Sequence, residues 1–295
     1  MVRHSGKYAV LFLAPWLIGL AVFSVYPIFY SLYLSFTDFN LFEAPQFIWA
    51  SNYQMLMGDP RFIQACKVTV TYVLVGVPLQ LAFALALALI LNNGIPGLKY
   101  FRAIYYLPAL LGGSVAISVL WRQVFGMAGI VNQFLELIGL SQSSEAISWI
   151  TNPRYSLYTI IILRVWQFGS PMIIFLAGLK QIPLELYESA SIDGASAFGK
   201  FIKITLPVLS PILLFNLIMQ IISAFQAFTP AYIIGGVTGG ALDSLLFYTL
   251  YLYIMGFTYF KMGFASSMAW ILMAAIAILT FLIFKFTKNM VYYED

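Results

Sequence analysis

One short stretch of the chain, residues 187–207, combines acidic, hydroxyl and glycine residues with a few apolar ones. It reads YESASIDGASAFGKFIKITLP and lies between two long apolar segments. Its acidic residues are Glu188 and Asp193, and Gly194 follows directly, where the chain can break. These residue types suit the docking of another protein. A membrane-embedded chain without a nucleotide site needs such a surface if another protein is to move it.

Two glycine patterns could be mistaken for ligand sites. Gly194, Gly199 and Lys200 have the spacing that begins a phosphate-binding P-loop. The next residue is Phe201 in place of the hydroxyl that would hold magnesium, and no predicted strand precedes the loop. We therefore attribute this match to chance. The four glycines within residues 235–240 predict a flexible outer turn and no ligand cradle.

A second group of polar residues lies inside the apolar segments. Arg164 stands well within one of them, with Gln167 close by, and an ionisable residue at membrane depth is a functional candidate. Arg164 could instead snorkel outward or pair with an acidic residue of an outer loop. Asn216, Gln220 and Ser223 have helical spacing in the next segment and share one face, which suits either interhelical hydrogen bonds or a substrate path. If the two faces meet, these five residues line one cavity near the bilayer midplane.

The composition indicates which kind of fold must position these residues. Of the 295 residues, 62% are hydrophobic and 9% are charged, whereas an average soluble domain carries about 25% charged residues. Such a chain cannot cover a water-facing surface, so it must be solvated by lipid. It contains one Cys and one His, which excludes an intrachain disulfide and a Cys/His metal site. The first apolar run is too long for a signal peptide and predicts a retained first helix.

Six segments are long enough to cross a hydrocarbon core, which takes about 20 apolar residues. Each must be helical, because backbone amides in lipid need partners within their own segment. The predicted fold class is therefore all-α: a polytopic membrane protein with six transmembrane helices and a cytoplasmic coupling helix. The predicted spans cover residues 9–36, 67–91, 103–125, 155–180, 205–229 and 262–286.

The basic residues predict the orientation of these spans. With the N-terminus inside, nine basic residues fall on inner segments and five on outer segments. Both termini are therefore predicted to be cytoplasmic, together with the connection 181–204, which we call the coupling segment. Residues 1–66 are predicted to form the first span with its outer loop, and residues 67–290 the transmembrane core. The inner basic residues are Arg3, Lys7, Lys99, Arg102, Lys180, Lys200, Lys203, Lys285 and Lys288, and the outer ones are Arg61, Lys67, Arg122, Arg154 and Lys261.

The stretch 187–207 resembles the EAA loop of ABC-importer permeases, whose pattern is Glu-Ala-Ala, then Asp-Gly-Ala, then Ile-x-Leu-Pro. The single departure is Ser189 in place of Ala, a small-for-small change. The resemblance extends over nearly the full chain, including TGGALDS at 238–244, and is to the first of two permeases in importers of the maltose and glycerol-phosphate type. The matching residues of the loop are Glu188, Ser189, Ala190, Asp193, Gly194, Ala195, Ile204, Leu206 and Pro207.

This resemblance implies roles for the residues of the coupling segment. Glu188 would engage a basic groove of a partner ATPase, with Asp193 in the same contact region. Gly194 would supply the bend that ends the coupling helix. The apolar positions that would fill the socket of that ATPase are Ala190, Ile192 and Ala195.

The resemblance also implies partners and a mechanism. The chain would pair with a second permease, with two ATPase subunits below and an extracytoplasmic substrate-binding protein above. The ATPases would hold ATP and magnesium, so this chain would carry no cofactor and catalyse no reaction. It would translocate a sugar, an oligosaccharide or a related polyol across a bacterial or archaeal cytoplasmic membrane by alternating access.

Two other classes of protein remain open on the sequence. An ion-coupled secondary transporter usually has acidic residues within its spans, but every Asp and Glu here falls outside the apolar cores. A membrane scaffold without transport function fits the composition but leaves the EAA-like loop unexplained. Many sugars would suit the same residues, and the cargo contacts lie either on this chain or mainly on its partner permease.

Overall fold

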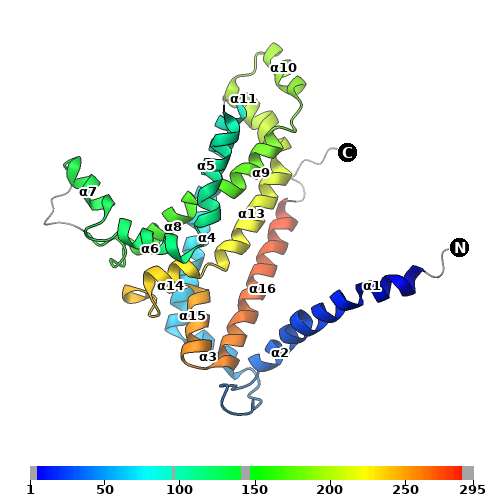
Figure 1. The fold of residues 1–295 in the computed structure, drawn as a ribbon, viewed down its shortest axis with the longest axis vertical. Coiled ribbons are helices and arrows are strands. Elements are labelled where there is room, and N and C mark those ends of the chain that lie inside the picture. Colours follow the sequence, from blue (N-terminus) through cyan, green and yellow to red (C-terminus); the bar gives the residue numbers. More distant parts are fainter. Residues whose placement is uncertain (1–4, 95–96, 141–146, 288–295) are drawn as a thin grey trace. The chain divides into compact units, whose positions relative to one another are not determined.

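The structure is a computed structural model, and it describes residues 5–94, 97–140 and 147–287. Most of the described residues are helical, and within these ranges there is no β-strand beyond an isolated bridge between Thr37 and Phe47 (Figure 1). The all-α prediction is confirmed. The chain forms two compact units, which are described separately: residues 1–59 with 252–274, and residues 60–251 with 275–295.

The first unit contains the N-terminal span. Asn52 is buried and donates from Nδ2 to the carbonyl oxygens of Ser35 at 2.9 Å and Thr37 at 2.8 Å. This amide closes the loop after the span. Phe12 and Phe23 are 83% and 81% exposed, so the span has apolar surface for lipid or for another subunit. The described elements are α1 (Ser5–Leu20), a π-helical turn (Ala21–Val25), α2 (Tyr26–Ser35), α3 (Ser51–Gly58), a second π-helical turn (Ile254–Thr258) and the first half of α16 (Met262–Thr287).

The second unit holds the remaining helices. They are α4 (Pro60–Asn92), α5 (Leu98–Leu111), α6 (Val115–Val124), α7 (Ile130–Leu137), α8 (Ser156–Trp166), α9 (Gly169–Leu179), α10 (Leu184–Ile192), α11 (Ala197–Lys200), α12 (Leu206–Val208), α13 (Ser210–Phe225), α14 (Thr229–Gly235) and α15 (Tyr248–Tyr253), whose last residues cross into the first unit. Helix α4 is central and packs against α8, α9 and α13. Gly76, Ala84 and Ala88 lie on its buried face and let these neighbours approach closely.

Within the described ranges, five helical stretches are long and apolar enough to cross a membrane, and a bent pair raises the number to six. The bent pair is α5 and α6, which meet at 95°. Gly112 and Gly113 permit this break, and the Ser114 hydroxyl caps α6 by accepting a hydrogen bond from the Ile117 amide at 3.3 Å. The predicted span 103–125 is therefore two helices that change direction.

The fourth and fifth predicted spans are also interrupted. The fourth breaks between Trp166 and Gly169, where α8 ends and α9 begins. Gly169 lies so close to α5 that an added Cβ would come within 2.4 Å of the Tyr105 carbonyl oxygen. The fifth begins as α13 at Ser210, later than predicted, because a π-helical turn over Phe201–Thr205 and the short α12 precede it.

Candidate functional site

The coupling segment is built around helix α10, which has a defined start and stop. Pro183 directly precedes its first residue, with an extended ψ of 132°. Its missing amide hydrogen costs nothing there, because the first amides of a helix have no intrahelical acceptor. The helix ends in a Schellman motif, in which Ala195 N donates to Ala190 O at 2.9 Å and Gly194 N donates to Ser191 O at 3.1 Å. Gly194 has a φ of +77°, the left-handed conformation that favours glycine. The predicted break at Gly194 is present.

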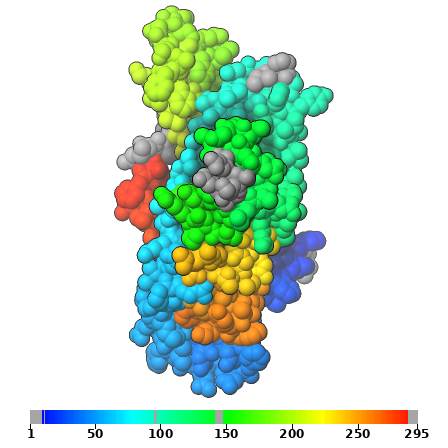
Figure 2. All heavy atoms as spheres, turned by 90° about the vertical axis from the view of Figure 1, so that its left-hand side faces the viewer, coloured from blue at the N-terminus to red at the C-terminus, as the bar shows by residue number. Residues whose placement is uncertain are grey.

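The surface of α10 is open. None of its residues is buried, and Ile192 is 88% exposed. Phe198 on the neighbouring α11 is 74% exposed. Figure 2 shows the segment, in yellow-green, projecting from the adjoining helices of the second unit. Apolar side chains gathered on a projecting, otherwise polar connection are typical of a protein-docking surface. Of the other predicted coupling residues, Glu188 and Asp193 are exposed, and Ala190 and Ala195 are half-buried.

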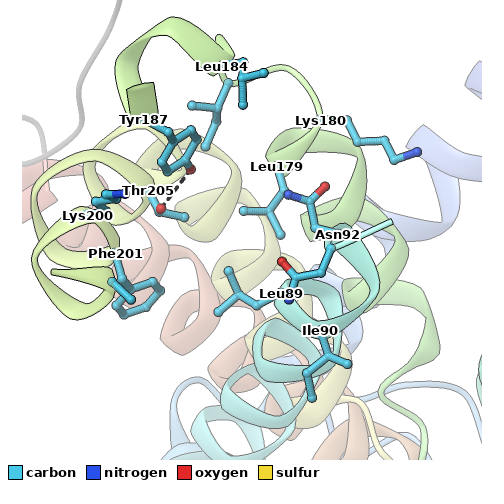
Figure 3. Close-up of a pocket in the computed structure, with 13 residues that line it drawn as sticks. Leu89, Ile90, Asn92, Leu179, Lys180, Leu184, Tyr187, Lys200, Phe201 and Thr205 are labelled. Carbon is cyan, nitrogen blue, oxygen red and sulfur yellow. Dashed lines mark hydrogen bonds between the residues drawn. The ribbon is translucent and has the colours of Figure 1, made fainter. Parts of the chain in front are cut away.

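Two side-chain hydrogen bonds join α10 to residues 197–205, which comprise α11 and the π-helical turn after it and which we call the following limb. The Tyr187 and Thr205 hydroxyls lie 2.8 Å apart (Figure 3), and Lys200 Nζ donates to Ser191 Oγ at 2.6 Å. Thr205 is 3% exposed, so this contact is anchored in the interior. In the described part of the chain, no side-chain hydrogen bond joins α10 to α9. A displacement of α10 would therefore be passed first to the limb that leads into α13.

A second group of residues, the intramembrane cluster, consists of polar side chains and the glycine packed against one of them: Tyr72, Gly76, Gln80, Arg164, Gln167 and Gln220. At its centre Arg164 is 6% exposed and donates from Nη2 to the Gln220 carbonyl oxygen at 2.7 Å and to Gln220 Oε1 at 3.1 Å. Its guanidinium lies 5.5 Å from the centre of the Tyr72 ring. An added Cβ at Gly76 would lie 3.1 Å from Arg164 Cδ. Within the residues that the structure describes, Arg164 thus neither snorkels outward nor pairs with an acidic residue; it joins α8 to α13.

Gln167 bridges two helix breaks. It follows the last residue of α8, and its carbonyl oxygen accepts from Gln80 Nε2 at 3.1 Å. Its own Nε2 donates to the carbonyl oxygen of Gly112 at 3.1 Å, at the bend between α5 and α6. Broken helices leave carbonyl groups without intrahelical partners, and these amides satisfy two of them. Gln167 therefore holds the break in place.

The polar stripe on α13 runs from interior to surface. Asn216 is 1% exposed, and neither Oδ1 nor Nδ2 has a partner in the described part of the chain. Gln220 is half-buried against Arg164, and Ser223 is exposed. The three residues share one face, as their spacing predicted, but they meet different environments. Of the five candidate path residues, the structure brings Arg164 and Gln220 into direct contact.

Three members of the intramembrane cluster were not singled out from the sequence. Gln80 could have been, because an amide within an apolar span is as informative as Arg164. Tyr72 and Gly76 give no such signal, since an aromatic ring and a glycine are common in membrane helices. Their role depends on α8 packing against α4, which only the tertiary structure specifies.

The glycine-rich loop at residues 235–240 and its surroundings are held by specific side-chain contacts. Arg61 forms a two-point ion pair with Asp243, at 3.1 Å from Nε and 2.7 Å from Nη2. The same Nη2 donates to the carbonyl oxygen of Thr238 at 3.2 Å. An added Cβ at Gly239 would lie 2.7 Å from Leu246 Cδ1. Arg61 and close packing hold this loop in the structure, and the expected flexibility of the turn stays a prediction.

Comparison with known proteins shows the family to which the chain belongs. Residues 47–291 match the family described as binding-protein-dependent transport system inner membrane component. The chain belongs to this family of ABC-importer permeases. It is 49% identical to the probable ABC transporter permease protein YesP of Bacillus subtilis, over all of this chain and 94% of that protein.

Two further relatives are named after sugars. The chain is 36% identical to the lactose transport system permease protein LacF of Rhizobium radiobacter, over 96% of this chain and 94% of that one. It is 32% identical to the trehalose/maltose transport system permease protein MalF of Thermococcus litoralis, over 96% and 92%. A chain of a bacterial alginate ABC transporter solved with its periplasmic protein has the same fold, with a TM-score of 0.83 at 20% identity over 98% of this chain and 96% of that chain.

Proposed function

We propose that this permease imports a sugar, an oligosaccharide or a related polyol. Family membership supports binding-protein-dependent import and disfavours an ion-coupled transporter or a scaffold. The names of relatives for lactose and for trehalose and maltose support a saccharide cargo. The observation that carries the ATP-driven part of the proposal is the exposed, sharply terminated helix α10, because it gives the spans a surface on which a separate ATPase can act.

In the proposed assembly the chain pairs with a second permease. Two ATPase subunits hold ATP and magnesium and bind the coupling segments, and a substrate-binding protein delivers the cargo from the other side. The excess of basic residues on one set of connections supports cytoplasmic termini and a cytoplasmic coupling segment. The chain itself holds no cofactor in this scheme.

The coupling residues have different roles in this proposal. Glu188 presents a negative charge to a basic groove, with Asp193 beside it, and Ile192 inserts into an apolar socket. Gly194 fixes the angle at which α10 meets the following limb. When the ATPases close on ATP, α10 moves with them, and the Tyr187–Thr205 and Lys200–Ser191 hydrogen bonds transmit the movement toward α13.

The cargo path runs along the α13 stripe in this proposal. Ser223 and the accessible part of Gln220 offer hydroxyl and amide groups to sugar hydroxyls. Arg164 positions Gln220 by binding its carbonyl and amide oxygens, and Gln167 holds the adjoining break. Asn216 lies deeper, and its unpartnered amide becomes available when α13 shifts.

The test of the coupling role reverses one charge. Glu188→Lys, assayed in the complete transporter in proteoliposomes with its binding protein, should abolish saccharide uptake while the two permeases still assemble. Glu136→Lys is the matched control, since Glu136 is also an exposed helical residue but lies on α7. Purified Glu188→Lys transporter that has lost its ATPase subunits would place the defect at docking. Normal uptake by Glu188→Lys would contradict the assigned role.

A further inference from the structure

A cavity of about 750 Å³ lies behind α10, between this helix and the C-terminal ends of α4 and α9 (Figure 3). Its apolar floor includes Leu179 and Ile182, which are 3% and 8% exposed. Tyr187 and Thr205 line its side with their shared hydrogen bond. The coupling mechanism proposed above leaves this cavity without a role.

The polar lining of the cavity is suited to an anion. Two ammonium groups and two amides belong to it, from Lys180, Lys200, Asn92 and Asn93, and none of its lining residues is acidic. Lys200 donates one of its three ammonium hydrogens to Ser191 Oγ, and the other two are available to a ligand. Lys180 is exposed, and its side chain points away from the other labelled lining residues (Figure 3). A phosphate group would find several donors here.

The apolar part of the lining indicates an amphiphile. Ile90 is 54% exposed at the rim of the cavity and continues a stripe on α4 with Leu79 and Phe83, which are 51% and 45% exposed. These positions share one helical face. The stripe therefore leads from the apolar length of a membrane span to the rim of the cavity. A soluble phosphate compound would make no use of this stripe.

We propose that the cavity binds the phosphate headgroup of an anionic membrane lipid, with an acyl chain along Leu79, Phe83 and Ile90. Basic pockets between membrane helices on the cytoplasmic side are known to take anionic headgroups. The assignment to the inner leaflet rests on the orientation in the proposed function. A bound lipid bridges α11, which follows the coupling helix and donates to it through Lys200, to the ends of α4 and α9. It thereby stiffens the seat of the coupling helix.

The test counts bound lipids on the complete transporter. Samples are prepared in nanodiscs of phosphatidylcholine with and without phosphatidylglycerol, and retained lipids are counted by native mass spectrometry. The double variant Lys180→Gln/Lys200→Gln should lower phosphatidylglycerol affinity on the order of tenfold, since each lysine contributes separately. Lys99→Gln/Lys285→Gln, two exposed basic residues outside the cavity, is the matched control and should retain the lipid. Lys200→Arg keeps the charge and should also retain it.

Three outcomes separate the possibilities. Equal phosphatidylglycerol retention by the cavity variant and its control overturns the lipid site. Release of the lipid by inorganic phosphate, with retention of phosphate itself, assigns the site to a free anion and overturns the lipid assignment. Saccharide uptake in proteoliposomes is measured separately. Absence of uptake in every lipid mixture would count against the proposed function, whereas the lipid count would still report on the cavity.

Discussion

The coupling segment and the intramembrane cluster use their polar side chains in different ways. Helix α10 ends in backbone hydrogen bonds and leaves most of its side chains exposed. In the intramembrane cluster the side chains themselves make the connections, and Arg164 and Gln80 are almost fully buried. A surface that must bind a partner keeps its side chains free, whereas broken helices in lipid need side chains to complete their backbone hydrogen bonds.

Two arginines of the second unit show the same contrast. Arg61 lies at the N-terminal end of α4, is partly exposed and pairs with the carboxylate of Asp243. Arg164 is buried, and the acceptors of its hydrogen bonds are neutral oxygens of Gln220. A surface ion pair of this type contributes at most about 1 kcal/mol. A buried guanidinium left without acceptors costs far more, so Arg164 and Gln220 form a fixed joint between α8 and α13.

The largest effect is expected from the backbone of the coupling segment. Gly194→Pro removes the amide that binds the Ser191 carbonyl and cannot adopt the observed φ of +77°. Uptake in proteoliposomes should be abolished, while membrane levels and pairing with the second permease persist. Gly194→Asn is the control, because asparagine tolerates the left-handed conformation and should keep most of the uptake. Substantial uptake by Gly194→Pro would show that the bend is dispensable.

A several-fold effect is expected from Gln220 in the intramembrane cluster. Gln220→Ala removes the side-chain amide but leaves the backbone carbonyl that Arg164 binds. The apparent affinity for the saccharide in uptake should therefore fall by about fivefold, which corresponds to a binding free energy on the order of 1 kcal/mol. Gln220→Leu should be worse, because it adds bulk without hydrogen bonding. The loss should differ among saccharides, and ATPase stimulation by the loaded binding protein should persist. An equal loss for every saccharide with reduced membrane levels would instead make Gln220 a purely structural residue.

The smallest effect is expected at the contact that connects α10 to the next limb. Tyr187→Phe removes one hydroxyl from the contact with Thr205 and should lower the number of saccharides imported per ATP by about twofold. The double variant with Thr205→Val should show less than the sum of the two single effects, since both delete the same bond. Tyr100→Phe, on an exposed tyrosine of α5, is the control. Additive effects would place the two residues in separate roles.

The sequence predicts the coupling helix well because its signals are local. Pro183 and Gly194 mark the two ends, and the structure has the helix between them. The sequence also identifies Arg164 as unusual, and its expected meeting with the α13 stripe is found at Gln220. In these cases a single residue type in an unsuitable environment carries the information.

The sequence does not predict the direction changes of the spans. Length and apolarity identify residues 103–125 as a membrane-spanning segment but carry no information about the 95° bend at Gly112. The hydrogen bonds from Gln80 to Gln167 and from Gln167 to Gly112 join residues far apart in the chain. These hydrogen bonds form because α4, the bend between α5 and α6 and the break between α8 and α9 meet, and that meeting is a property of the tertiary structure. The same holds for the contacts of Arg61 with the glycine-rich loop, which join residues far apart in the chain.

The most direct test of the account asks what touches Ile192. A photo-reactive benzoylphenylalanine at this 88% exposed position is activated in the complete transporter in native membranes. The account predicts a cross-linked product containing this permease and the ATPase subunit, and a higher yield when ATP closes the ATPases. The same probe at Phe134, 57% exposed on α7, should not capture the ATPase. Capture of the substrate-binding protein at position 192, or of the ATPase at position 134 only, would contradict the assignment of α10 as the coupling helix.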